Sequence, residues 1–393
     1  YGILKAGGTV VNYSPLYAEP ELLHQIEDSH TDMMVTLNLQ VLYPKMRSLL
    51  AKSRLTKLIV GTLPDVLPFP KNLLYPLAKS KDVAKVPTDV EHIPFRELLN
   101  NDGAFQPADI DPAEDVAVLQ YTGGTTGVSK GAMLTHSSYL WDAEAIVKHA
   151  QMTGEDRFLC ILPLFHVNAQ VVTTLAPMIA GGSMVLTPKF SPVDFFETLA
   201  TSEATAFSGV PTVYAILNNM PGLENYDLSR LRFCICGAAP MPVEVFETFE
   251  KKFNAVIMEG YGLTEGTCAS SVNPLDKRKI GSIGLPLEGQ EMKIQDGEIC
   301  IKGPNLMQGD YKNPEATAAA IRDGWLHSGD LGRVDVIGVE YAGGLKIHNP
   351  MLGQVIVEPQ SDSACKARAG LVLDRTVDIP DGGAAAQDQV GLH

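Results

Sequence analysis

The sequence predicts an α/β fold in which helices cover mainly parallel β-sheets, followed by a small β-rich subdomain. Strand-like and helix-like segments alternate over residues 1–279, and this alternation is typical of parallel sheets. From residue 280 the pattern changes to short runs broken by glycine and proline, which indicates a β-rich unit over 280–335. The tail, 336–393, is rich in glycine and alanine near its end, and we expect it to be poorly ordered.

The alternation defines the expected elements in order. Predicted strands are short apolar runs, and predicted helices carry apolar residues three or four positions apart. The expected strands are 31–37, 57–61, 116–122, 156–164, 183–187, 205–211, 231–237 and 255–262. The expected helices are 40–53, 135–150, 166–182, 193–202, 212–220 and 242–253. One apolar stripe on the last helix comprises Val243, Phe246, Phe249 and Phe253.

A proline-rich segment spotted with lysine, 64–107, interrupts this pattern and is predicted to be an irregular surface region. Its part LPFPKNLLYPLAKSK (67–81) combines apolar and basic residues, which is compatible with peripheral contact at the inner membrane. A loop packed on its own domain is the favoured alternative.

The composition is that of an acidic globular protein. The chain has 393 residues and a net charge of −15, which argues against a nucleic-acid partner because phosphate backbones require clustered Lys and Arg. Small-molecule ligands fit better. No apolar stretch has the length of a membrane span and no signal peptide is evident, so a cytoplasmic location is expected. Because the chain opens at Tyr1 rather than at Met, the absence of a signal is weak evidence.

The six cysteines are scattered and show no CxxC pair or metal-ligand spacing with histidine. We therefore expect buried thiols in a reducing compartment rather than disulfides or a metal site. Cys234 and Cys236 are two residues apart in an apolar run, so they should share one face of a strand.

A glycine-rich segment, YTGGTTGVSKG (121–131), follows the strand 116–122, and a helix with Thr135 or Ser137 as N-cap is expected after it. Glycines let backbone N–H groups approach an anion, threonine hydroxyls add donors, and Lys130 adds a charge, so a polyphosphate would use all these features. The segment is neither a Walker A loop, because Gly131 follows the lysine, nor GxGxxG. The alternative is a flexible surface turn.

The stretch LQYTGGTTGVSKG (119–131) resembles the phosphate-loop signature of the acyl-adenylate-forming (AMP-binding) superfamily, with Ser129 where the family usually has proline. The resemblance is closest to bacterial long-chain fatty-acid–CoA ligases and runs from Tyr1 to about Asp335. It implies the large N-terminal domain of these enzymes. After Asp335 no hinge or C-terminal α+β lid is recognisable, and we expect a truncated or frame-shifted family member.

Further motifs resemble the family in the same order. EGYGLTE (259–265) resembles the adenine motif, which implies that Tyr261 stacks on adenine, Thr264 donates to the α-phosphate and Glu265 holds Mg²⁺. In GWLHSGDLG (324–332), Asp330 resembles the ribose-binding carboxylate. The alternatives are a strand-end turn with a core tyrosine and a solvated glutamate, and an ordinary turn aspartate.

Three more segments resemble walls of the substrate sites. ICGAAPMP (235–242) resembles the adenine and acyl lining, and SGVPTVY (208–214) resembles an acyl-pocket wall. LPLFHVN (162–168) resembles the acyl-pocket motif with its histidine, and the alternative for His166 is a core or cap residue.

The resemblance implies ATP-dependent activation of a fatty acid to acyl-AMP, then transfer to coenzyme A, with Mg²⁺ as cofactor. An adenylation unit serving a carrier protein and a non-catalytic nucleotide-binding remnant are the alternatives, because the lid is not recognisable. The oligomeric state cannot be predicted. The expected catalytic residues are Thr122, Lys130, Thr264 and Glu265. The expected ATP-binding residues are Thr122, Gly123, Gly124, Thr125, Thr126, Lys130, Gly237, Ala238, Ala239, Glu259, Gly260, Tyr261, Thr264 and Asp330. The expected acyl-pocket residues are His166, Gly209, Val210, Tyr214 and Gly262.

Overall fold

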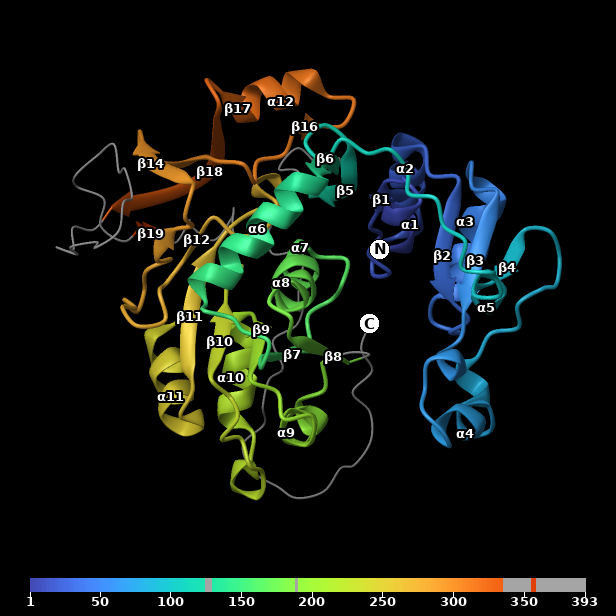
Figure 1. The fold of residues 1–393 in the computed structure, drawn as a ribbon, viewed down its shortest axis with the longest axis horizontal. Coiled ribbons are helices and arrows are strands. Elements are labelled where there is room, and N and C mark those ends of the chain that lie inside the picture. The colour runs from blue at the N-terminus through green and yellow to red at the C-terminus, as the bar shows by residue number, and fades with distance from the viewer. Residues whose placement is uncertain (124–128, 188–189, 335–354, 358–393) are drawn as a thin grey trace.

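The computed structural model of the chain describes residues 1–123, 129–187, 190–334 and 355–357 (Figure 1). Four sheets and the helices between them form a mixed α/β architecture, as predicted. In Figure 1 the N-terminal sheet lies at the right, the β-rich region at the upper left, and the large central sheet with its helices below the β-rich region.

The N-terminal sheet is parallel and has three strands in the order β2–β3–β4. Its core buries apolar side chains from the preceding helices, among them Leu22, Ile26 and Leu49. The expected irregular segment 64–107 is partly regular, because it supplies an edge strand and two helices. The elements of this region are α1 Gly2–Lys5, α2 Glu19–Ser29, β2 Met33–Leu37, α3 Tyr43–Lys52, β3 Lys57–Gly61, α4 Lys71–Ala78, β4 His92–Pro94 and α5 Phe95–Leu98.

The central sheet has seven strands in the order β13–β12–β11–β10–β9–β7–β8. Strands β8, β7, β9, β10 and β11 are parallel, and β12 and β13 add an antiparallel edge. The bounds are β7 Arg157–Cys160, β8 Ser183–Leu186, β9 Ala206–Gly209, β10 Phe233–Cys236, β11 Val256–Tyr261, β12 Ser271–Val272 and β13 Leu285–Pro286.

Both faces of this sheet are covered, which explains why the central strand β10 is apolar and buried at every position. On β10, Phe233 and Ile235 belong to one core cluster and Cys234 and Cys236 to the other, so the two thiols share a face as predicted. The helices packed around the sheet are α6 His136–His149, α7 Val167–Gln170, a π-helix Val171–Leu175, α8 Ala176–Ile179, α9 Pro192–Thr201, α10 Pro211–Asn219 and α11 Val243–Phe253.

Two expectations about these helices need correction. The single helix predicted at 166–182 is instead three consecutive segments with a π-helical middle. On α11 the stripe buries Phe246, Phe249 and Phe253, whereas Val243 is exposed because it begins the helix at the end of the sheet.

A third, mixed sheet has the order β1–β5–β6–β16, and it changes the expected local structure around the glycine-rich segment. The segment does not lead directly into a helix. It connects the two antiparallel strands of a β-hairpin, and α6 begins only after β6, with Thr135 as its N-cap. The bounds are β1 Val10–Val11, β5 Val116–Thr122, β6 Lys130–Thr135 and β16 Gly309–Asp310.

The β-rich region contains a sheet with the path β14–β15–β18–β17, and β19 pairs with β18. Of the expected tail 336–393, only β19 belongs to the described residues. The bounds are β14 Glu291–Gln295, β15 Glu298–Lys302, α12 Pro314–Ala320, β17 Ile321–Arg322, β18 Trp325–Val334 and β19 Val355–Val357.

Candidate nucleotide-binding site

The β5–β6 hairpin sets the position of the expected phosphate-binding residues. Thr122 and Lys130 are cross-strand partners, so they mark the two ends of the glycine-rich connection. Gly123 is described, whereas Gly124, Thr125 and Thr126 lie outside the described residues. The Lys130 ammonium group makes no salt bridge with any carboxylate in the described part of the chain. A cation without an ion-pair partner beside a glycine-rich connection is available to an anionic ligand.

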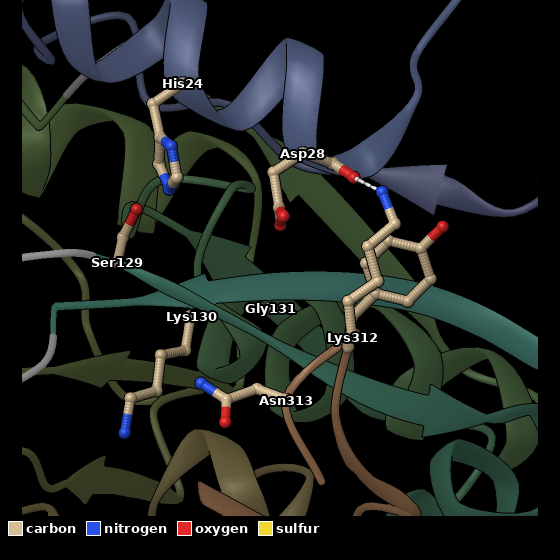
Figure 2. Close-up of a pocket in the computed structure, with 8 residues that line it drawn as sticks. His24, Asp28, Ser129, Lys130, Gly131, Lys312 and Asn313 are labelled. Atoms are coloured by element: carbon tan, nitrogen blue, oxygen red, sulfur yellow. Dashed lines mark hydrogen bonds between the residues drawn. The ribbon is translucent and has the colours of Figure 1, made fainter. Parts of the chain in front are cut away.

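A cavity of about 240 Å³ lies on one flank of Lys130. In Figure 2, His24 and Asp28 point from α2 toward the start of β6, and Lys312 and Asn313 come from the segment after β16. The Lys312 ammonium group donates to the backbone carbonyl of Asp28 and lies 2.9 Å from Nε2 of His30. Sequence reasoning missed His24 and Lys312 because they belong to no local motif and lie far from Lys130 in the chain.

The segment after Leu306 connects the hairpin to the turn that carries Thr264 and Glu265. Met307 donates its N–H to the carbonyl of Glu265 at 2.8 Å, and Tyr311 donates to the carbonyl of Gly131 at 2.8 Å. Residues 307–311 are thus bound by backbone hydrogen bonds to the Glu265 turn at one end and to the hairpin at the other. Lys130 and Glu265 are therefore placed on neighbouring, rigidly joined elements.

Buried polar side chains hold the Glu265 turn in place. Asn305 donates to the carbonyl of Gly266 at 2.8 Å, and Asp142 accepts a hydrogen bond from the Ala269 N–H at 3.0 Å. Asp142 is fully buried, and burial raises the pKa of its carboxyl group well above the usual value. The turn also contains Thr267 at φ 66°, a strained conformation for a β-branched residue.

The adenine and ribose motifs meet directly. The Tyr261 hydroxyl, at the end of β11, donates a hydrogen bond to Oδ2 of Asp330 at 2.7 Å. Behind them, Gly237 approaches the carbonyl of Gly260 so closely that an added Cβ would lie 3.1 Å from that oxygen. Ala238 follows at φ 70°. Glu259 is buried and its Oε2 accepts the N–H of Gly281 at 3.1 Å, so it supports the backbone beside this motif.

The expected acyl residues lie around the ends of β9 and β11. Tyr214 is fully buried and donates to the carbonyl of Ile235 at 2.8 Å, and a Cβ added to Gly262 would lie 1.7 Å from the carbonyl oxygen of Cys268. Both residues therefore have packing roles, and an acyl contact for them stays a prediction, as it does for Gly209 and Val210.

His166 is the N-cap residue of α7, and its ring centre lies 4.5 Å from that of Phe165. Burial lowers the pKa of His166, so its imidazole is neutral near pH 7. The carbonyl of Phe165 accepts a hydrogen bond at 2.9 Å from Gln120 on β5, which joins this motif to the hairpin.

The described residues thus form two linked groups rather than one enclosed cavity. Lys130 lines the cavity described above, whereas Glu265 and Asp330 do not. The structure also brings together Glu298, Cys300 and His327, three residue types that can bind a metal ion. Their possible ligand atoms lie within 4.8 Å of one another across two strands, a grouping that their spacing in the sequence did not predict. The five described cysteines are free and buried, as predicted; Cys365 lies outside the described residues.

Comparison with known proteins identifies the family of the chain. A family model described as "AMP-binding enzyme" matches residues 1–311. The chain belongs to the AMP-binding enzyme family. It is 38% identical over 367 residues to a long-chain-fatty-acid–CoA ligase of Bacillus subtilis, covering 87% of this chain and 64% of that protein. It is 34% identical to a ligase of the same name from Escherichia coli O6:H1, covering 85% and 63%.

The fold of this AMP-binding chain also matches solved structures. ATP-bound MatB from Rhodopseudomonas palustris aligns with a TM-score of 0.71 at 27% identity, over 85% of this chain and 63% of that protein. The chain therefore spans somewhat less than two thirds of the length of these relatives. Among the described residues, no helix is both long and apolar enough to cross a membrane.

Proposed function

We propose that this AMP-binding chain binds ATP and activates a fatty acid as acyl-AMP, the first half of an acid–thiol ligase reaction. The observation that carries the proposal is the hydrogen-bonded connection from the Lys130 hairpin through residues 307–311 to the Glu265 turn. It joins a cation and a carboxylate on neighbouring rigid elements of a chain whose family and relatives are adenylate-forming.

Each expected residue has a defined task in this reaction. Lys130 and the glycine-rich connection that begins at Thr122 would bind the β- and γ-phosphates, which leave as pyrophosphate. Thr264 would donate to the α-phosphate, where the fatty-acid carboxylate attacks. Tyr261 and Asp330 would hold adenine and ribose. Because the transition state spreads negative charge over phosphate oxygens, positioning and cationic stabilisation provide most of the catalysis.

A magnesium ion fits the residues at the turn. Mg²⁺ is commonly held by one or two carboxylates together with waters and substrate phosphates. Glu265 is a partly buried carboxylate on a backbone-anchored turn, which suits that role. When bound there, the ion would neutralise charge on the phosphates.

Coenzyme A is proposed as the acceptor of the acyl group, and long-chain fatty acids as the substrate class, because the relatives named above are long-chain-fatty-acid–CoA ligases. A non-catalytic nucleotide-binding role is the second candidate. It is favoured by one observation, that Lys130 lines the described cavity whereas Glu265 and Asp330 do not.

Product analysis separates these functions. The chain is incubated with ATP, Mg²⁺ and a panel of fatty acids, with and without coenzyme A, and acyl-AMP and acyl-CoA are measured by mass spectrometry. Acyl-AMP supports the proposed reaction, and acyl-CoA supports both half-reactions. ATP binding with neither product and no pyrophosphate exchange supports the non-catalytic role, and a chain that does not bind ATP at all contradicts both.

Peripheral membrane contact through α4 is part of the proposal. None of the eight residues of this helix is buried, and Phe69, Leu73 and Leu77 are exposed. Although the whole chain carries a net charge of −15, residues 66–86 contain four lysines and one aspartate. Exposed apolar side chains that are close to lysines in the sequence suit an anionic lipid surface, from which a fatty acid could be supplied.

A further inference from the structure

The ribose motif lies on a bulge in the β-rich sheet. On β15, Glu298 pairs with Leu331 of β18, and Cys300 pairs with His327. One residue of β15, Ile299, therefore faces three residues of β18, and the two extra residues loop out of the ladder. Gly329 has φ 73°, a conformation that favours glycine. Asp330 is the last residue of this bulge.

The Glu298 carboxylate closes the bulge with both of its oxygens. Oε1 accepts the N–H of Gly329 at 2.7 Å, and Oε2 lies 2.8 Å from Nδ1 of His327. The His327 side chain is 8% exposed and that of Glu298 is 25% exposed, so solvent competes weakly for these bonds. Although burial opposes the charged form, the hydrogen bonds from His327 and Gly329 lower the pKa of Glu298 overall.

Ser328 also supports the bulge. Its hydroxyl donates to the carbonyl of Ile299 at 2.7 Å and accepts the N–H of Asp330 at 3.0 Å. The three residues of the bulge are thus each held by β15 or by one another. Because Asp330 also accepts the hydrogen bond from Tyr261, a shift of the bulge would move its carboxylate away from β11.

We propose that Glu298 is a positioning residue for nucleotide binding, which holds the Gly329–Asp330 bulge so that the Asp330 carboxylate faces the ribose hydroxyls. Glu298 need not contact the nucleotide itself. Each oxygen of Glu298 already has a hydrogen-bond donor, His327 for Oε2 and Gly329 for Oε1. These bonds explain why Glu298, Cys300 and His327 lie close together without requiring a metal ion. This inference rests on the proposed role of Asp330 in ATP binding.

The test measures how strongly the chain prefers ATP to 2′-deoxyATP by isothermal titration calorimetry, for Glu298→Gln, Asp330→Asn and the double variant. Glutamine keeps the size of Glu298 but loses the charge and one acceptor. We expect Glu298→Gln to weaken ATP binding by roughly tenfold, the range for a lost charge-assisted hydrogen bond, and to reduce the preference for ATP. The double variant should be no worse than Asp330→Asn alone, because both act through one carboxylate.

Controls separate positioning from loss of folding and from metal binding. Glu291→Gln, on the exposed side of β14 in the same subdomain, should bind both nucleotides as the unchanged chain does. If Glu298→Gln does not fold, His327→Asn removes the other partner and is measured instead. Equal loss of ATP and 2′-deoxyATP affinity, full additivity in the double variant, or a preference that disappears on adding EDTA in magnesium-free buffer would each overturn the inference. An unchanged preference in Asp330→Asn would instead contradict the proposed role of Asp330.

Discussion

The hydroxyl of Tyr261 donates a hydrogen bond to Oδ2 of Asp330 at 2.7 Å across 69 residues of sequence. Tyr261 ends a strand of the central sheet, whereas Asp330 belongs to the β-rich sheet. The bond therefore joins the two parts of the chain that carry the expected adenine and ribose contacts.

Tyr261→Phe should weaken ATP binding about fivefold. The phenyl ring keeps the stacking surface, and the loss corresponds to one hydrogen bond of about 1 kcal/mol that orients Asp330. Calorimetric titration of ATP measures the change. Tyr75→Phe, on α4 far from the ribose motif, is the matched control, and equal affinities for Tyr261→Phe and the unchanged chain would contradict the prediction.

Lys130→Gln should weaken ATP binding about tenfold or more while AMP binding changes little. The lysine is expected to contact only the outer phosphates, and its charge is worth about 1.5–3 kcal/mol in such a contact. Parallel titrations with ATP and AMP measure the difference. Lys81→Gln, on the exposed segment after α4, controls for the change in net charge. Equal losses for the two nucleotides would show that Lys130 does not act on the outer phosphates.

Asp142→Asn should remove a pH dependence of stability. Burial raises the pKa of Asp142 in the folded chain, so the folded state keeps a proton that the unfolded state loses above about pH 4. Stability is then fully present below the unfolded pKa and falls as the pH rises toward the folded pKa, by up to about 1.4 kcal/mol per pH unit. Asparagine keeps the acceptor for Ala269 without this loss.

Urea unfolding at pH 5 and pH 8 measures the effect. The variant should gain stability relative to the unchanged chain at pH 8, and by less at pH 5. Asp227→Asn, at an exposed loop position, should leave the difference between pH 5 and pH 8 as it is, because the hydrogen bond from Ser229 lowers the pKa of Asp227 rather than raising it. A gain of the same size at both pH values would show that Asp142 is not the group responsible.

Gly262→Ala should destabilise the chain by about 3 kcal/mol or more, because the new methyl group would overlap the backbone of Cys268, which cannot move as a flexible side chain would. Gly2→Ala, where nothing lies within 4 Å of the added atom, is the matched control. Denaturant unfolding of both variants measures the difference, and a near-neutral Gly262→Ala would show that the turn relaxes.

Replacing Leu73 and Leu77 together by serine should reduce binding to vesicles containing phosphatidylglycerol about thirtyfold or more, since each exposed leucine contributes about 1 kcal/mol or more when it leaves water. Cosedimentation with vesicles measures binding. The control is a double variant in which serine replaces Val41 and Val90, two apolar residues elsewhere in the chain that are at least as exposed as Leu73 and Leu77. Equal binding of the unchanged chain to phosphatidylcholine vesicles would contradict the role of the lysines.

Much of the fold could be predicted because local patterns decide it. The strand at 116–122 was predicted at its observed position, and Thr135 was one of the two predicted N-caps, since apolar runs and N-caps depend on neighbouring residues. The strand Lys130–Thr135 was missed because its partner determines it. The local sequence of these residues is equally compatible with a loop that leads into a helix, and only the pairing with β5 makes them a strand.

By itself the sequence determined the chemistry available to this protein: an α/β scaffold, a glycine-rich connection ending at Lys130, and a carboxylate at Asp330 in a glycine turn. Only the tertiary structure decided which of these groups meet. The contacts of Tyr261 with Asp330, of Glu298 with the bulge and of Lys312 with α2 join residues distant in the chain. Such contacts arise from strand pairing and packing, which no short window of sequence encodes, because their energy exists only once the partner is in place.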